Sequence, residues 1–340
     1  MQLLPKVFDA VALNDPLTYF AVFLGVSLLM LWRLEAMLDQ GLEGTALGTL
    51  LLPYCSGLGN LIFVGLMVPK FGAGREVLTN CLVNNVTNLT LLLGLPALCW
   101  GLAIMPAASG KGGKGGRGGK AAKGGGTEAQ INRLSLLLTL TAVLFFTAAV
   151  WLLGLDGQLS RTDGFALIGL FLFWQCVQVF DVMKHNVRSR VSFGWRFYGD
   201  ALVVMVCGWF IYESLDWLVG WISAQRHGFI SRDNLGWLTG WLMVLPNAVL
   251  ALYWGWRRRA DVVFSSQVGD GHICIPLCLG LFALWAPLPV PEFARQSFLL
   301  LGGAAVAHML FLLFAGGLPR WAGAVMCLAY GGFVYVGLAG

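Results

Sequence analysis

Charged residues are scarce in this sequence: they make up 11% of its 340 residues, whereas roughly a quarter of a typical soluble domain is charged. Apolar residues make up 58% and recur in runs of about 20 residues, the length of helix that crosses a hydrocarbon core of about 30 Å. This balance excludes a soluble protein. It predicts an all-α membrane protein.

The sequence also lacks the local motifs of common enzymes: a His-Glu-x-x-His zinc pair, a Gly-x-Ser-x-Gly elbow and a phosphate-binding loop. We therefore expect no enzyme and no bound cofactor. The first residues do not have the basic, apolar and small-residue pattern of a cleavable signal peptide, so the first span is expected to stay in the protein. All eight cysteines fall in apolar stretches, where a thiol packs as a small hydrophobe, and no disulfide is expected.

Charge and Gly/Pro breaks between the apolar runs predict ten transmembrane helices. They lie near residues 17–37, 44–69, 77–105, 132–155, 163–183, 198–224, 234–256, 262–287, 296–316 and 321–338. If both termini face outward, fifteen of the 22 Lys and Arg residues are cytoplasmic, as the positive-inside rule requires of a cell inner-membrane protein. Five of them lie in a Gly/Lys-rich segment within residues 107–130, which predicts a flexible cytoplasmic loop rather than a nucleic-acid site.

An internal repeat organises the chain. Residues 89–97 read LTLLLGLPA and residues 275–283 read IPLCLGLFA, which places Gly94 opposite Gly280 at a spacing of 186 residues. Five helices in each half would give the halves opposite orientations, the inverted-repeat plan of many secondary transporters. We therefore expect a five-helix repeat at 1–183, a cytoplasmic connector at 184–197 and a second five-helix repeat at 198–340.

The third predicted helix carries an unusual density of polar groups, TNCLVNNVTNLT at residues 79–90. Asn84 and Asn88 are four residues apart, so their amides lie on one face of a helix, and amide oxygens can coordinate a hard cation. Asn80 and Asn85 flank them, and Asn60 lies in the preceding helix. The alternative is that these amides hydrogen-bond between helices and only support packing.

The second polar cluster, SSQVGDGHICIPLC at residues 265–278, opens the eighth predicted helix. Asp270 is the acid in its centre, and an intramembrane carboxylate usually binds a cation or a proton; alternatively it lies at a helix end near water. Ser266 and Cys274 are further candidate ligands. His272, Cys274 and Cys278 could together bind a soft metal, but their spacing matches no strong ligand motif.

At these two clusters the sequence resembles the cation/calcium exchanger superfamily, which includes the sodium/calcium exchangers. Members carry two repeats of G-T-S-x-P-E, each followed further along by G-S-N-I-x-N and a run that ends in L-G-L. Here residues 83–88 read VNNVTN, with Asn84 at the family's serine, and residues 269–274 read GDGHIC. Leu245-Pro246-Asn247 resembles the family's L-P-E and lies 23 residues before Asp270.

The resemblance implies ten helices in two inverted halves, with broken helices holding ions near the midplane. It predicts a cation site of Asn84, Asn88, Asn247 and Asp270, with Na⁺, Ca²⁺ or H⁺ as the cation, moved by alternating access as helices one and six rock. Neither acid of the G-T-S-x-P-E segments is present: Asn247 replaces one, and the first-repeat counterpart is either Leu52-Pro53-Tyr54 or Gly59-Asn60-Leu61. Because two glutamates would balance calcium's charge, a transport-inactive scaffold or sensor subunit is the alternative.

Overall fold

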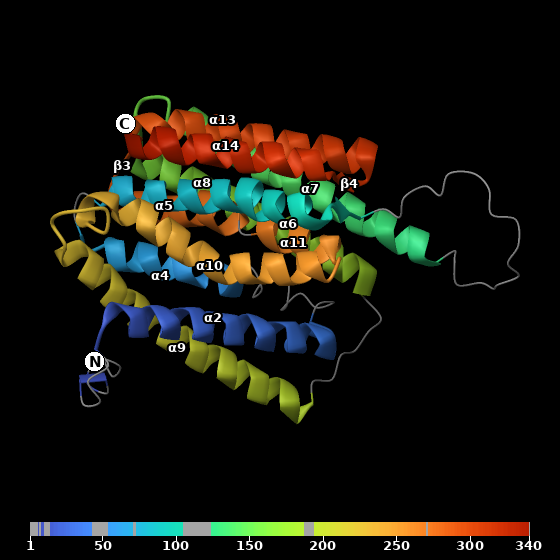
Figure 1. The fold of residues 1–340 in the computed structure, drawn as a ribbon, viewed down its shortest axis with the longest axis horizontal. Helices are drawn as coiled ribbons and strands as arrows, with labels where there is room; N and C mark the ends of the chain where they lie inside the picture. Colours follow the sequence, from blue (N-terminus) through green and yellow to red (C-terminus); the bar gives the residue numbers. More distant parts are fainter. Residues whose placement is uncertain are drawn as a thin grey trace, which may run out of the picture. The chain divides into compact units, whose positions relative to one another are not determined.

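The computed structural model describes residues 14–42, 54–70, 73–104, 124–186, 194–269 and 271–339, together with Lys6, Phe8 and Asp9 (Figure 1). Within these ranges, nine helices are long and apolar enough to cross a membrane. They are Pro16–Leu42, Gly74–Trp100, Asn132–Leu153, Arg161–Phe180, Trp195–Ala224, Arg232–Trp256, Ala260–Trp285, Glu292–Ala315 and Arg320–Leu338. A shorter apolar helix, α4 (Leu58–Met67), lies inside the second predicted span, whose residues 44–53 are outside the described part. The prediction of an all-α membrane protein is confirmed.

The described chain forms two compact units, and each continues through several separate segments of the sequence. The first unit comprises residues 1–84, 153–246 and 272–291, and the second comprises residues 85–152, 247–271 and 292–340. Unit boundaries fall inside three helices, α5 (Gly74–Thr87), α7 (Gly124–Leu153) and α10 (Leu235–Trp256). The units therefore differ from the two sequence halves, and the predicted borders at 183 and 198 remain predictions.

In the first unit, α2 (Pro16–Met37) and α9 (Trp195–Ala224) lie side by side (Figure 1). Asp15 begins α2 by accepting hydrogen bonds from the N–H groups of the first turn, and Pro16 suits the first helical position because its missing N–H would have no partner there. Arg33 pairs with Asp200 at 3.2 Å. Toward the other end Tyr19 stacks on Trp217 with ring centroids 4.0 Å apart.

The first unit also contains α8 (Arg161–Asn186) and α12 (Leu279–Trp285), which cross at glycines. A Cβ added to Gly164 would lie 2.9 Å from the carbonyl oxygen of Gly280, so the missing side chain allows the two backbones to approach. Beside this crossing, strand β2 (Gln158–Leu159) pairs antiparallel with β3 (Leu288–Pro289), and Leu159 lies opposite Leu288.

The second unit contains a similar crossing between α6 (Leu93–Trp100) and α14 (Arg320–Ala339). A Cβ added to Gly323 would lie 2.5 Å from the carbonyl oxygen of Gly94. Strand β1 (Leu102–Ala103) pairs antiparallel with β4 (Gly317–Leu318), and Leu102 lies opposite Leu318. Arg320 donates a hydrogen bond to the Cys99 carbonyl at 3.1 Å, which satisfies a carbonyl in the last turn of α6.

The two crossings are equivalent by sequence position. One side of each crossing shows a spacing of 186 residues, from Gly94 to Gly280 and from Leu102 to Leu288. The other side shows a spacing of 159 residues, from Gly164 to Gly323 and from Leu159 to Leu318. The two spacings differ by 27 residues, so the first half carries an insertion of that length between its third and fifth helices, where the Gly/Lys-rich segment lies. That segment is outside the described residues as far as 123, and its cytoplasmic position remains a prediction.

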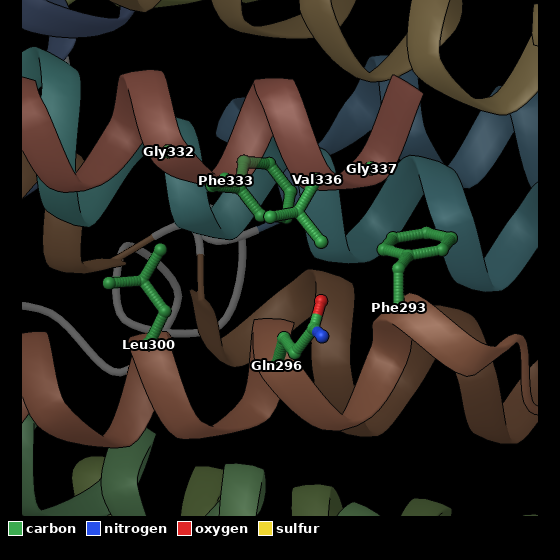
Figure 2. Close-up of a pocket in the computed structure, with 7 residues that line it drawn as sticks. All are labelled: Phe293, Gln296, Leu300, Gly332, Phe333, Val336 and Gly337. Carbon is green, nitrogen blue, oxygen red and sulfur yellow. The ribbon is translucent and has the colours of Figure 1, made fainter. Parts of the chain in front are cut away.

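The remaining spans are α7 (Gly124–Leu153), α11 (Ala260–Gly269) and α13 (Glu292–Leu310), all in the second unit. A groove of about 210 Å³ lies between α13 and α14. Figure 2 shows its lining, which is apolar except for the amide of Gln296: Phe293, Gln296, Leu300, Gly332, Phe333, Val336 and Gly337. None of the predicted cation ligands lines this groove.

Candidate functional site

Two π-helical turns interrupt the helices that carry the polar clusters. The first, η2 (Asn88–Leu92), lies between α5 and α6, and the second, η5 (Ile273–Cys278), precedes α12. Residues 274–278 are the 186-residue equivalents of 88–92, so Asn88 corresponds to Cys274. A π turn is rare and is frequently found at functional sites, because it frees backbone groups and redirects side chains. Both repeats therefore carry this irregularity at the predicted ligands.

In the first unit the structure brings together three of the predicted residues. The Asn84 amide donates toward Asn60 Oδ1 at 3.5 Å, and the Cys274 thiol donates to Asn84 Oδ1 at 3.6 Å. All three side chains are 3% exposed or less. Asn84 is thus the middle member of a buried polar group. Residues 52 and 53 lie outside the described part of the chain, so both alternatives for the first-repeat motif remain open.

Asn80 lies one turn before Asn84 on α5 and has a partner that the sequence did not suggest. Its amide nitrogen donates to Thr239 Oγ1 at 3.0 Å, while Asn80 Oδ1 has no hydrogen-bond partner among the described atoms. Two glycines of α10 allow this approach, since a Cβ on Gly240 would lie 2.8 Å from Val83 Cβ. The Gly236 N–H also donates to Glu76 Oε2 at 2.8 Å. These contacts fix α10 against α5 beside the cluster.

In the second unit a residue that was not predicted, Gln267, connects two that were. Its amide donates to Ser266 Oγ at 2.9 Å and to the backbone carbonyl of Asn247 at 3.5 Å. Gln267 is 1% exposed, and its Oε1 has no hydrogen-bond partner among the described atoms. This oxygen is a further candidate ligand from the same segment.

Asn85 and Asn88 also belong to the second unit and are almost completely buried. A Cβ on Gly271 would lie 3.1 Å from Asn85 Oδ1, so the third helix comes close to the residue that follows Asp270. Asp270 itself lies outside the described residues. The convergence of Asn84, Asn88, Asn247 and Asp270 on one cavity therefore remains a prediction.

The soft-metal alternative receives no support from the geometry. Among the described residues, no three His, Cys, Asp or Glu side chains are grouped so that they could hold a metal ion. His272 packs instead against Trp174, with ring centroids 5.2 Å apart. All eight cysteines are free thiols. A second histidine, His308, was not predicted; it is fully buried and its Nε2 lies 2.7 Å from the Leu89 carbonyl oxygen.

The family model described as sodium/calcium exchanger protein matches this sequence in two segments, residues 16–180 and 200–338. The chain belongs to this family. Its fold is also that of solved exchanger structures. The sodium-calcium exchanger NCX_Mj soaked with 2.5 mM Na⁺ and 10 mM Sr²⁺ matches with a TM-score of 0.62 and 16% identity, over 95% of this chain and 98% of that chain.

The same exchanger soaked with 2.5 mM Na⁺ and 1 mM Sr²⁺ matches with a TM-score of 0.63 and 16% identity, over 96% of this chain and 98% of that chain. NCX_Mj soaked with zero Na⁺ and Ca²⁺ matches with a TM-score of 0.58 and 17% identity, over 93% and 98%. No match is found among curated proteins. The resemblance inferred from the degenerate repeat motifs is therefore confirmed, and it extends over nearly the whole chain.

Proposed function

We propose that this protein moves a small cation across the cell inner membrane by alternating access, through a site near the bilayer midplane. The observation that carries the proposal is the buried group of Asn60, Asn84 and Cys274 beside a π-helical turn, in a chain of the sodium/calcium exchanger family. Polar groups at membrane depth are costly, so they normally face the bundle interior, where they pair with one another or line an ion path. The solved neighbours concern ion exchange by NCX_Mj, which supports this reading.

The ligand chemistry favours a cation of low charge. Amide oxygens from Asn84, Asn88 and Asn247 carry no net charge, and Asp270 would supply one negative charge. Both positions where the family has a glutamate hold uncharged residues here: Asn247 in the second repeat, and either Leu52-Pro53-Tyr54 or Gly59-Asn60-Leu61 in the first, neither of which contains an acid. A single carboxylate matches Na⁺ or H⁺ better than Ca²⁺, whose protein sites usually use several carboxylates.

The pair α2 and α9 supplies the element that would move. The ion pair of Arg33 with Asp200 and the stacking of Tyr19 on Trp217 join these helices at two separate levels. Gln40 adds a hydrogen bond to Asp200 at 2.9 Å. Helices joined in this way move as one body, which suits the rocking of the first and sixth helices over a fixed site.

The test is ion flux in proteoliposomes that contain the purified full-length protein. Imposed gradients of Na⁺, K⁺, H⁺ and Ca²⁺ are compared, with protein-free liposomes as the control. We expect flux driven by a monovalent gradient and abolished in Asp270→Asn, which removes the charge and keeps the shape. A folded protein that shows neither flux nor cation-dependent thermal stabilisation would instead be a scaffold or sensor subunit, the reading that the missing glutamates favour.

A further inference from the structure

His308 is a fully buried histidine of α13 that contacts both polar segments of the second unit. Its Nε2 lies 2.7 Å from the carbonyl oxygen of Leu89, the residue after Asn88. Its ring packs edge-on against Phe264, at 5.7 Å between centroids and 86° between planes. Phe264 belongs to α11, which also carries Ser266 and Gln267. One side chain therefore joins the two segments that supply the predicted ligands.

The Leu89 carbonyl lies within the π turn η2, where the hydrogen bonds of a regular α-helix are altered. In a regular α-helix this oxygen would accept the N–H of Leu93, four residues later. Here the Leu93 N–H donates to the Thr90 carbonyl instead. The Leu89 oxygen therefore does not make its ordinary α-helical bond, and a buried carbonyl inside the membrane needs a donor. His308 places Nε2 at 2.7 Å from this oxygen, from a neighbouring helix.

The contact also fixes which ring nitrogen carries the proton. A carbonyl oxygen can only accept, so Nε2 of His308 is the N–H group and Nδ1 is the bare acceptor. Nδ1 has no hydrogen-bond partner among the described atoms. Among the described atoms, the imidazole therefore makes one hydrogen bond, which it donates to the π turn.

We propose that His308 is a positioning residue for cation transport: by donating to Leu89 it holds the π turn η2 in place and so keeps Asn88 oriented toward the cation. His308 does not itself touch the ion. The inference rests on the proposed function, because positioning Asn88 matters for transport only if Asn88 is a ligand. A carbonyl held from α13 prevents the turn from relaxing to a regular α-helix, which would rotate Asn88 and every residue before it.

The test compares variants of the full chain that keep or remove the donor. His308→Gln places an amide N–H at about the reach of Nε2, and His308→Asn is one methylene shorter and cannot reach Leu89. Ser297→Ala is the matched control, because Ser297 is also fully buried on α13 but donates only within its own helix, to Phe293 at 2.9 Å. The readouts are the cation concentration for half-maximal flux, the maximal flux, and hydrogen exchange of a peptide covering residues 86–95.

We expect His308→Asn to raise the half-maximal cation concentration about tenfold or more and to increase hydrogen exchange in 86–95, while His308→Gln and Ser297→Ala remain within about threefold of the wild type. Equal values for His308→Gln and His308→Asn would overturn the proposal, as would an increase in exchange spread evenly over the protein. If the wild type neither transports nor is stabilised by a cation, the proposed function fails. The exchange data then still decide whether His308 holds the π turn.

Discussion

Replacing Asn84 with aspartate should convert a neutral, buried candidate ligand into a charged one with nearly the same shape. Asn84 lies between Asn60 and Cys274 and is fully buried. Without a cation, an uncompensated charge at such a place destabilises a protein by about 3–5 kcal/mol. With a monovalent cation bound about 4 Å away, an effective dielectric constant of about 20 gives an attraction of about 4 kcal/mol, and a divalent cation doubles it. Tenfold in affinity corresponds to about 1.4 kcal/mol, so binding of a monovalent cation should tighten by up to about a thousandfold, and binding of Ca²⁺ by more.

The assay is thermal unfolding in detergent at alkaline pH, where the new carboxyl is ionised, across a series of Na⁺, K⁺ and Ca²⁺ concentrations at constant ionic strength. Asn84→Asp should melt earlier than the wild type without the cation and recover when it is added, because a ligand stabilises the folded state by mass action. The largest gain is expected for Ca²⁺, since the added charge restores part of what the family's glutamates supply.

Gln175→Glu is the matched control. Gln175 lies on α8, is 4% exposed and undergoes the same amide-to-carboxylate change, but it is not a predicted ligand. It should lose stability without any recovery specific to one cation. If both variants respond alike, or if Asn84→Asp binds no cation more tightly than the wild type, the reasoning that Asn84 is a ligand is refuted.

Three further predictions concern the fold and the helix ends. Gly323→Ala should destabilise the protein by about 1–3 kcal/mol through overpacking, because the new Cβ would lie 2.5 Å from the Gly94 carbonyl oxygen. Gly303→Ala is the control: a Cβ there meets no atom within 4 Å, so the variant should be neutral or slightly stabilised in thermal unfolding. Asp15→Ala should lower the melting temperature at neutral pH. The Thr18 hydroxyl and two backbone N–H groups hold the pKa of Asp15 below its ordinary value, so the carboxylate stabilises the fold above the pKa of the unfolded state and this stabilisation is lost as the pH falls through the pKa of the folded state. In acid, the melting temperatures of the variant and the wild type should therefore become equal. Deleting residues 109–126 should leave membrane insertion and flux unchanged, and a chain that no longer inserts would contradict the loop assignment.

The helices and the internal repeat were predictable because their signals are local or periodic. Apolar runs gave the spans, and the LGL segments gave the 186-residue offset, which reappears in the pairing of Leu102 with Leu318 and of Leu159 with Leu288. The offset also left two alternatives for the first-repeat motif. Asn60, in one of them, contacts Asn84, but residues 52 and 53 of the other lie outside the described chain, so the sequence and the structure leave both open.

The residues that were missed have partners far away in the sequence. Thr239 contacts Asn80 across 159 positions, and His308 contacts Leu89 across 219. A single Thr, Gln or His in an apolar helix has the same appearance whether it bonds to its own helix or to another. Gln267 lies inside the second polar cluster, but a neutral amide can be satisfied by one hydrogen bond to its own helix, so the sequence does not mark it as a ligand in the way it marks the acid Asp270. Tertiary structure is needed to separate these cases.

The π turns bear on whether the chain transports or only keeps the fold. A scaffold needs its helix crossings, and the glycines at 94, 164, 280 and 323 provide these by packing alone. Among the described residues, π turns also occur at Leu38–Leu42 and Phe311–Ala315, away from the predicted ligands, so the relevant feature is that η2 and η5 lie in the two polar clusters. These two turns stand at repeat-equivalent positions, while the predicted ligands on them differ, Asn88 in one half and Cys274 in the other. Backbone geometry retained in both halves while side-chain chemistry changes is what a binding site adapted to a different cation would produce, and it favours transport over the scaffold.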